Sequence, residues 1–425
     1  MLAILLQTLL AGTLLTQTPK TNTTLFPFLP DTGYITVYPE NDNRMFYWHF
    51  PSKTNPDTAP ILIWLQGGPG CASSGGLFFE NGPFIVKNYT IDQKAENRPF
   101  AWNEKANLLF PDQPLGIGFS TVSEGRVAET ATDIQEQFLL FFQGFLAKYP
   151  KYKGRPVFVS GESYGGHWIP YIGSALFYSN DPDINMKGLL IGNGYVYSKI
   201  SNIYYPKFAY KYKNYTNLSA EKYTELVKNA DLCAHLTDIH PTPQFAPRTY
   251  DLCNNIEGVI NEIATKFNPT FSQYYMPGGW EENTQFLPFL NSEPVQKLLG
   301  VNKKFDSCNN TFGDVFGSQD YYMDAREYVV RLLGDGVRVW FYNGDLDMDC
   351  NYDMEEYLLG RMEWSGRRAW VGKGLEECVY GLCKEVLGLK YVRFVGAGHM
   401  VPDFKPRLCL DMVNEFMDWA QKGQN

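Results

Sequence analysis

One serine stands in a pattern that is typical of covalent catalysis. The run Gly161 to Gly165 reads Gly-Glu-Ser-Tyr-Gly and follows a short apolar stretch at 157–159. Between a strand and a helix, a Gly-x-Ser-x-Gly pattern predicts a nucleophile elbow, a sharp turn that holds the serine oxygen clear of a sheet. Both flanking glycines are expected to be required, because a Cβ at either position would collide with neighbouring backbone. Ser163 is therefore the candidate nucleophile for acyl transfer.

A serine hydroxyl needs a base, and the base needs a carboxylate that orients it. Among the five histidines, His399 is the best base candidate, because it stands in a glycine-rich loop directly after the apolar stretch 391–395. Sites of α/β sheets lie at such strand ends. The carboxylate is expected between the serine and the histidine in the chain. Asp345 and Asp347, which follow the stretch 337–342, satisfy this order equally well.

A second glycine-rich loop could provide a backbone hydrogen-bond donor for the developing oxyanion. Residues 66–70 read Gln-Gly-Gly-Pro-Gly and follow the apolar stretch 61–65. An oxyanion hole usually takes one N–H from the residue after the nucleophile and another from a glycine-rich loop beyond an early strand. The backbone N–H groups of Gly68 and Tyr164 are the expected donors.

The elements that must position these groups are short apolar stretches, which alternate with longer helical patterns along the chain. This alternation indicates an α/β fold with a mostly parallel central sheet flanked by helices. Apolar residues at helical spacing predict a helix within 127–149, ended by Pro150. From about residue 197 the alternation gives way to a Tyr-, Asn- and Pro-rich segment, as expected of an inserted cap. We expect a signal peptide at 1–18, a core at 19–195 and 289–425, and a cap at 196–288. The expected strands are 61–65, 108–110, 157–160, 189–192, 337–342 and 391–395.

Composition excludes some classes of function. The 425 residues carry a formal net charge of −9, which disfavours nucleic acid as a partner because phosphate binding requires a concentrated basic surface. No paired Cys-x-x-Cys motif or EF-hand spacing is present, so no metal and no cofactor is expected.

The N-terminus indicates export. Residues 1–15 form an apolar run of signal-peptide length, with cleavage expected between Gly12 and Lys20; a buried first helix is the alternative. No second run of transmembrane length follows, so we expect no membrane anchor and a secretory-pathway location, either secreted or in a lysosome or vacuole. Asn-x-Ser/Thr triplets, the acceptors of N-glycosylation, agree with this location and occur at Asn22, Asn88, Asn214, Asn217 and Asn309.

Six ordered blocks resemble the serine carboxypeptidase family, whose members have the α/β-hydrolase fold. They are WLQGGPGCASSGGLFFENGPF from Trp64, FAWNEKANLLFPDQPLGIGFS from Phe100, GESYGGHWIP from Gly161, FLNSEPVQKLLGV from Phe289, FYNGDLDMDCN from Phe341 and GAGHMVP from Gly396. The resemblance implies release of C-terminal residues from peptides or proteins, with Ser163, Asp347 and His399 as the triad.

The family resemblance also implies how a substrate's C-terminal carboxylate is bound. Glu80 and Glu162 match two acidic family positions that share a proton, so binding should weaken as pH rises. Gln66 stands where much of the family has asparagine, although the vitellogenic-like branch of the family also carries glutamine. The remaining positions of the carboxylate site would be Trp64, Gln66, the N–H of Gly67, and Asn103.

Eight cysteines fit a disulfide-containing enzyme better than a metalloprotein. The resemblance implies that Cys71 pairs with Cys308 and Cys233 with Cys253, and spacing alone suggests a Cys378–Cys383 bridge. Cys350 matches a free thiol in the family's pocket, where with Met400 it would line the site of the departing residue. Pairing of Cys350 with the leftover Cys409 is the alternative.

Two other functions remain open from the sequence. One is an acyltransferase that passes the acyl group to an alcohol, as plant relatives of this family do. The other is a protective or scaffolding protein with an incidental hydrolase site. The oligomeric state, including a homodimer, is not fixed by the sequence.

Overall fold

The structure, a computed structural model, describes residues 25–87, 94–123, 125–239, 246–320 and 323–422. The expected signal peptide and the triplets at Asn22 and Asn88 lie outside these residues. Within them, ten strands form one sheet in the order β1-β2-β6-β3-β7-β8-β9-β12-β11-β10. These strands are β1 (Asp31–Tyr38), β2 (Asn43–Phe50), β3 (Ile61–Leu65), β6 (Asn107–Pro111), β7 (Pro156–Ser163), β8 (Asn185–Gly194), β9 (Arg338–Gly344), β10 (Glu376–Cys378), β11 (Gly381–Val386) and β12 (Leu389–Phe394). A separate pair consists of β4 (Phe84–Ile85) and β5 (Glu96–Asn97).

The centre of the sheet is parallel, as predicted. The six expected strands correspond to β6, β3, β7, β8, β9 and β12, and each pairs in parallel with its neighbour in that order. All five residues of β3 are buried, as in a parallel sheet covered on both faces. The antiparallel strands β1, β2, β10 and β11 at the two edges were not among the expected strands.

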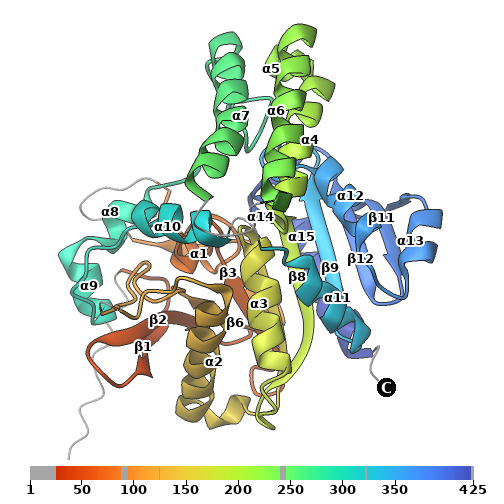
Figure 1. Cartoon of the computed structure of the whole chain (residues 1–425). Coiled ribbons are helices and arrows are strands. Elements are labelled where there is room, and N and C mark those ends of the chain that lie inside the picture. Colours follow the sequence, from red (N-terminus) through yellow and green to blue (C-terminus); the bar gives the residue numbers. More distant parts are fainter. Residues whose placement is uncertain (1–24, 88–93, 124, 240–245, 321–322, 423–425) are drawn as a thin grey trace, which may run out of the picture.

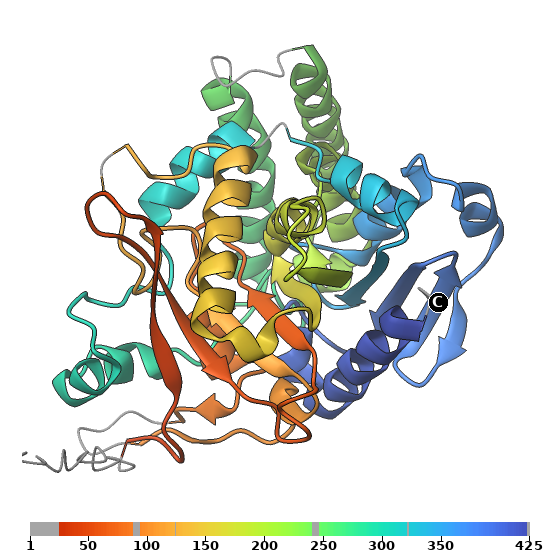
Figure 2. The ribbon, with the colours of Figure 1, turned by 90° about the horizontal axis from the view of Figure 1, so that it is seen from below.

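Helices cover both faces of this sheet (Figures 1 and 2). A Cβ on Gly188 would lie 2.9 Å from Phe416 of α15, whereas Leu189 lies 2.5 Å from the Cβ position of Gly173 on α3. Because consecutive residues of a strand face opposite sides, α3 and α15 lie on opposite faces of β8. The helices are α1 (Ser73–Phe79), α2 (Ala131–Lys148), α3 (Gly165–Phe177), α4 (Ser198–Lys211), α5 (Lys213–Thr216), α6 (Ala220–Ile239), α7 (Ala246–Phe267), α8 (Phe286–Leu290), α9 (Glu293–Leu299), α10 (Asn310–Asp320), α11 (Arg326–Gly334), α12 (Tyr352–Arg361), α13 (Arg367–Gly372), α14 (Val401–Phe404) and α15 (Pro406–Lys422).

The predicted helix before Pro150 is α2, which begins four residues later than the apolar pattern. Thr130 accepts a hydrogen bond from the backbone N–H of Asp133, and the Asp133 side chain accepts one from the backbone N–H of Thr130. This capping box satisfies donors that the first turn leaves free. The cap therefore sets the start of the helix at Ala131.

The segment after β8 is helical, although its composition gave no helical signal. Helices α6 and α7 project side by side from the body of the molecule (Figure 1), and a disulfide between Cys233 and Cys253 joins them. Their apolar residues form a second cluster with Met348 and Tyr352 from the body. The chain rejoins the sheet only at Arg338, while the expected cap boundary at 288 falls inside α8. Among the described helices, none is long and apolar enough to cross a membrane.

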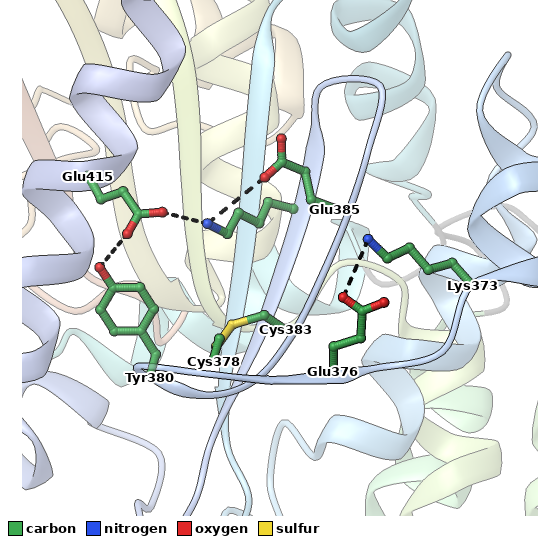
Figure 3. The surroundings of a disulfide bond; sticks show 8 residues. Lys373, Glu376, Cys378, Tyr380, Cys383, Glu385 and Glu415 are labelled. Carbon is green, nitrogen blue, oxygen red and sulfur yellow. Dashed lines mark hydrogen bonds and ion pairs between the residues drawn. A yellow bond between two sulfur atoms is a disulfide. The ribbon is translucent and has the colours of Figure 1, made fainter.

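A small hairpin, β10 with β11, completes the sheet near the C-terminus. The Cys378–Cys383 disulfide closes it, as Figure 3 shows. The Tyr380 hydroxyl donates to Glu415 of α15 over 2.6 Å. The hairpin is thereby attached to the last helix, far along the sheet from Ser163.

Candidate active site

Ser163 lies at the turn between β7 and α3 with a φ of 59°, a left-handed conformation that is strained for a residue with a side chain. A Cβ on Gly161 would lie 2.0 Å from the carbonyl oxygen of Leu65, so this position requires glycine. The expectation was wrong for Gly165, whose Cβ would lie an ordinary 3.4 Å from that oxygen. The second required glycine is Gly166, where a Cβ would lie 2.6 Å from the backbone of Tyr195, directly after β8.

The structure separates the two aspartates that spacing left open. His399 Nδ1 lies 2.7 Å from an Asp347 oxygen, and both side chains are buried. Asp347 also accepts hydrogen bonds from Asn193 Nδ2 at 2.6 Å and from the N–H of Cys350 at 3.2 Å. Asp345 instead accepts a 2.7 Å hydrogen bond from the N–H of Gly396. Of these two aspartates, Asp347 is the one that hydrogen-bonds to His399.

The environment of His399 favours its protonated form. Burial lowers the pKa of the imidazole, but the neighbouring Asp347 and Asp349 carboxyls outweigh burial and leave this pKa above its ordinary value. The ring packs beside Tyr274, with centroids 5.0 Å apart. Ser163 and His399 line one cavity, so a substrate carbonyl in that cavity would have both groups within reach.

The loop after β3 packs directly on the nucleophile turn. A Cβ on Gly67 would lie 2.6 Å from both the Ser163 Cβ and the Tyr164 nitrogen, and only glycine allows this approach. Gly68 has a φ of 114° and lines the cavity beside Ser163. The Tyr164 hydroxyl donates to buried Asp320 over 2.7 Å, and Asp320 also contacts His167 Nδ1. This buried network, which the sequence did not indicate, anchors the residue after the serine.

Three buried polar side chains form a cluster beside the serine. The Trp64 indole N–H donates to Gln66 Oε1 over 3.0 Å, which fixes the orientation of the amide. Gln66 Nε2 then donates to Glu80 at 3.1 Å and to Glu162 at 3.0 Å. Both amide hydrogens of Gln66 are therefore used within the protein. The Glu80 and Glu162 carboxyls also lie within hydrogen-bond reach of each other, and no other described side chain donates to their second oxygens.

Burial keeps this carboxyl pair protonated at pH values where an exposed glutamate would be ionised. It raises the pKa of Glu80 to about 7, although hydrogen bonds from Glu162 and Gln66 oppose the rise. Burial and then the neighbouring Glu80 raise the pKa of Glu162 as well. Glu162 and Gln66 line the cavity, whereas Glu80 lies behind them.

Two cavities meet at Ser163. The larger, of about 410 Å³, is lined by Tyr164, Cys350 and residues of α7. The smaller, of about 150 Å³, is lined by Gln66, Glu162, His399 and Met400, and by the Cys71–Cys308 disulfide.

Two sequence expectations need correction. Cys350 and Met400 do not share a wall, because the turn at Asp347 points Cys350 into the larger cavity while Met400 borders the smaller one. Asn103 lines neither cavity, since the turn at 102–104 directs its side chain to the carbonyl of Pro51 at 3.3 Å. Trp102, its neighbour, packs edge-on against Trp64 instead.

The remaining expected positions are distributed as follows. Cys350 and Cys409 are free and buried. Asn214 and Asn217 are exposed, whereas Asn309 is partly buried and its side chain accepts a hydrogen bond from the N–H of Phe312 at 3.1 Å.

One group of side chains near the triad has metal-ligand chemistry. Ligand-type atoms of Asp349, Cys350 and His399 lie within 4.8 Å of one another. A cation there would engage the histidine that faces Asp347. The group therefore fits inhibition by a soft metal better than a catalytic metal centre.

Several residues that line the site gave no catalytic signal in the sequence. Asp349 lies between two recognised residues, Asp347 and Cys350, and its position was the only hint. Glu257, Gln273 and Tyr274 come from the segment after β8, and the tertiary fold alone brings them to the serine.

The fold and this arrangement define an α/β hydrolase. The family model described as serine carboxypeptidase matches residues 19–419. The chain is 32% identical to vitellogenic carboxypeptidase of Aedes aegypti over 400 residues, which cover 90% of this chain and 82% of that protein. It is also 32% identical to carboxypeptidase Y of Schizosaccharomyces pombe, covering 91% of this chain and 41% of that protein.

A solved structure shows the same fold. The prohormone-processing carboxypeptidase Kex1 from Saccharomyces cerevisiae superposes with a TM-score of 0.78 at 24% identity, over 92% of this chain and 91% of that one. With the family match, the conclusion is direct: the chain belongs to the serine carboxypeptidase family, and the protein is a serine carboxypeptidase.

Proposed function

We propose that the enzyme releases C-terminal residues from peptides through an acyl-enzyme on Ser163. The serine oxygen attacks the last peptide carbonyl while His399 accepts its proton, and Asp347 holds the imidazolium that forms. The N–H groups of Gly68 and Tyr164 stabilise the oxyanion. His399 then protonates the departing amine. Water, deprotonated by His399, hydrolyses the ester and releases the shortened peptide.

The observation that carries the proposal is the buried Glu80–Gln66–Glu162 cluster beside Ser163. A protonated Glu162 in the cavity wall can donate a hydrogen bond to the terminal carboxylate of a peptide, which an endopeptidase site has no need to bind. Because both hydrogens of the Gln66 amide are already engaged, Gln66 positions the two carboxyls instead of binding the substrate. Gly67 contributes its backbone at the same wall.

We also propose a cellular location and a domain division for the enzyme. Three disulfides and exposed acceptor residues at Asn214 and Asn217 support passage through the secretory pathway. We retain a core at 19–195 and 289–425 and a cap at 196–288 as the proposed division. Peptide hydrolysis should be favoured at acidic pH relative to ester hydrolysis, because a protonated carboxyl pair is needed to bind the terminal carboxylate of a peptide but not to bind an ester.

The test is a timed digestion of one peptide in two forms, a free C-terminal acid and a C-terminal amide, followed by mass spectrometry. We expect successive loss of single C-terminal residues from the acid, much slower cleavage of the amide, and no loss with Ser163→Ala. Internal cleavage, or equal rates for acid and amide, would contradict the proposal. A reaction with added alcohol separates an acyltransferase, because a transferase would give mostly the ester of the shortened peptide at a low alcohol concentration, whereas a hydrolase would give mostly the free acid.

A further inference from the structure

The larger cavity beside Ser163 is acidic. Glu257 of α7 and Asp349 of the loop after β9 both line it. None of its lining residues is a lysine or arginine. Among the residues that the structure describes, no lysine or arginine forms an ion pair with either carboxyl, and the nearest basic group to Asp349 is His399, which is already engaged by Asp347. Two carboxyls that no lysine or arginine neutralises are costly in a partly buried site, so the cavity favours an incoming cation.

Neighbouring groups hold the two carboxyls toward the same space. The Gln273 amide donates to Asp349 Oδ1 at 3.4 Å and also hydrogen-bonds to Glu257. Gln273 Oε1 in turn accepts a hydrogen bond from Asn261, which fixes the direction of the amide. The Ser198 hydroxyl lines the same cavity, is fully buried, and lies within hydrogen-bond reach of the Tyr195 hydroxyl.

The rest of the wall suits a long cationic side chain. Tyr195 and Tyr274 line the cavity and offer aromatic faces on which a guanidinium or ammonium group can pack. The volume of about 410 Å³ exceeds that of the smaller cavity, about 150 Å³. An arginine or lysine would therefore find room, two carboxyl acceptors and a hydroxyl acceptor in one place.

The position of this cavity relative to Ser163 decides which substrate residue enters it. The carboxyl pair that would bind the terminal carboxylate lies in the smaller cavity, so the departing residue belongs there. The residue on the acyl side must then lie across Ser163, in the cavity lined by Glu257. Asp349 borders both cavities, whereas Glu257 lines only the larger one.

We infer that the enzyme prefers substrates with lysine or arginine as the penultimate residue, bound on the acyl side by Glu257 and Asp349. This inference rests on the proposed function, since it takes the smaller cavity as the site of the C-terminal residue. It assigns Glu257 and Asp349 as specificity-determining residues.

The preference should strengthen as pH rises. Burial, and then the charge of Glu257, raise the pKa of Asp349 to about 8, while His399 opposes the rise. Burial also raises the pKa of Glu257. A bound cation favours the ionised forms, which become available at higher pH. The other titratable groups that face this pair are Asp347, Cys350, His399, Tyr195, Tyr205 and Tyr274, and none of these carries a permanent positive charge.

The test uses blocked dipeptides with arginine, leucine or glutamate in the penultimate position and phenylalanine at the C-terminus. In the parent enzyme we expect kcat/KM for arginine to exceed that for leucine by about tenfold or more, with a larger ratio at pH 7.5 than at pH 5. Glu257→Gln should reduce this ratio about tenfold. Glu257→Lys should reverse the order of arginine and glutamate. The matched control is Glu282→Gln, in the smaller cavity. This variant should keep the parent's ratio of kcat/KM for the arginine peptide to kcat/KM for the leucine peptide.

Each outcome has a defined meaning. Hydrolysis of the leucine peptide without any arginine preference, or a preference that survives Glu257→Gln, overturns this inference and leaves the proposed function intact. Failure to hydrolyse any of the dipeptides overturns both. Ratios are compared within each variant, and thermal melting confirms that it is folded, so a partly folded preparation cannot imitate the expected result.

Discussion

The carboxyl pair makes a quantitative prediction about pH. Burial holds the pKa of Glu80 at about 7, so the pair is neutral below this pH and carries a negative charge above it. A negative pair repels the terminal carboxylate of a peptide, but not an ester that lacks a carboxylate. Deprotonation of His399 affects both substrates equally and cancels in the ratio of their kcat/KM values.

The size of the effect follows from a single ionisation. Below pH 6 the ratio of kcat/KM for the peptide to that for the ester should be constant. It should fall about tenfold between pH 5 and pH 8, because the protonated fraction of the pair decreases about tenfold for each pH unit above the pKa. The assay measures kcat/KM from pH 4.5 to 8.5 for a blocked dipeptide acid and the ester of the same acyl group. Because His399 has a raised pKa, the ester rate itself should continue to rise above pH 7.

Substitutions of the two glutamates test whether the carboxyl pair causes the fall of the peptide-to-ester ratio with pH. The double substitution Glu80→Gln with Glu162→Gln should give a ratio that does not change with pH. Glu282→Gln, a matched change in the same cavity, should retain the fall near pH 7. A parent ratio that is flat across this range, or a fall that persists in the double variant, would refute the paired-carboxyl reasoning.

Three further predictions follow from individual side chains. Asp347→Asn should lower kcat by up to roughly four orders of magnitude, while Asp345→Asn should cost much less because that carboxyl binds backbone N–H groups, including those of Gly396 and Ala397, and not His399; equal losses measured by steady-state kinetics would contradict the assignment. Buried Glu355 has no hydrogen-bond partner among the described residues and a pKa raised by burial to about 8, so its stabilising contribution, complete below pH 4.5, is lost as pH rises to 8. Glu355→Gln should therefore raise the free energy of unfolding relative to the parent by up to about 5 kcal/mol more at pH 8 than at pH 4.5, and a gain independent of pH in denaturant titrations would show the carboxyl to be ionised in the fold. A mercurial should inactivate the parent but not Cys350→Ser, because the free Cys350 lines the larger cavity, and an insensitive parent would show the thiol to be out of reach.

The sequence predicted those parts of the fold that have a local signal. Apolar stretches gave the parallel strands, because strands buried on both faces must be continuously apolar. The antiparallel strand β2 (Asn43–Phe50), which lies between the edge strand β1 and β6, mixes polar and aromatic residues and was not predicted. The helices α6 and α7 were not predicted either, since their apolar residues serve a cluster shared with Met348 and Tyr352, which lie a hundred residues along the chain.

For the candidate site, spacing brought forward Ser163 and His399 but could not choose between Asp345 and Asp347. That choice depends on the direction of each side chain after β9, which the structure gives through the contact of Asp347 with His399. Glu257 could not be predicted, because nothing along α7 distinguishes it from a solvated helical glutamate. Its place in the cavity follows only from how α7 packs over the sheet.

The central claim is that Ser163 is acylated during peptide hydrolysis. The most direct test is to react the enzyme with a fluorophosphonate, measure residual peptide hydrolysis at each extent of labelling, and map the modified residue by mass spectrometry. We expect one phosphonate per chain on Ser163, loss of activity in proportion to labelling, and no labelling of Ser163→Ala. Modification of another residue, or full peptide hydrolysis by a completely labelled enzyme, would contradict this claim.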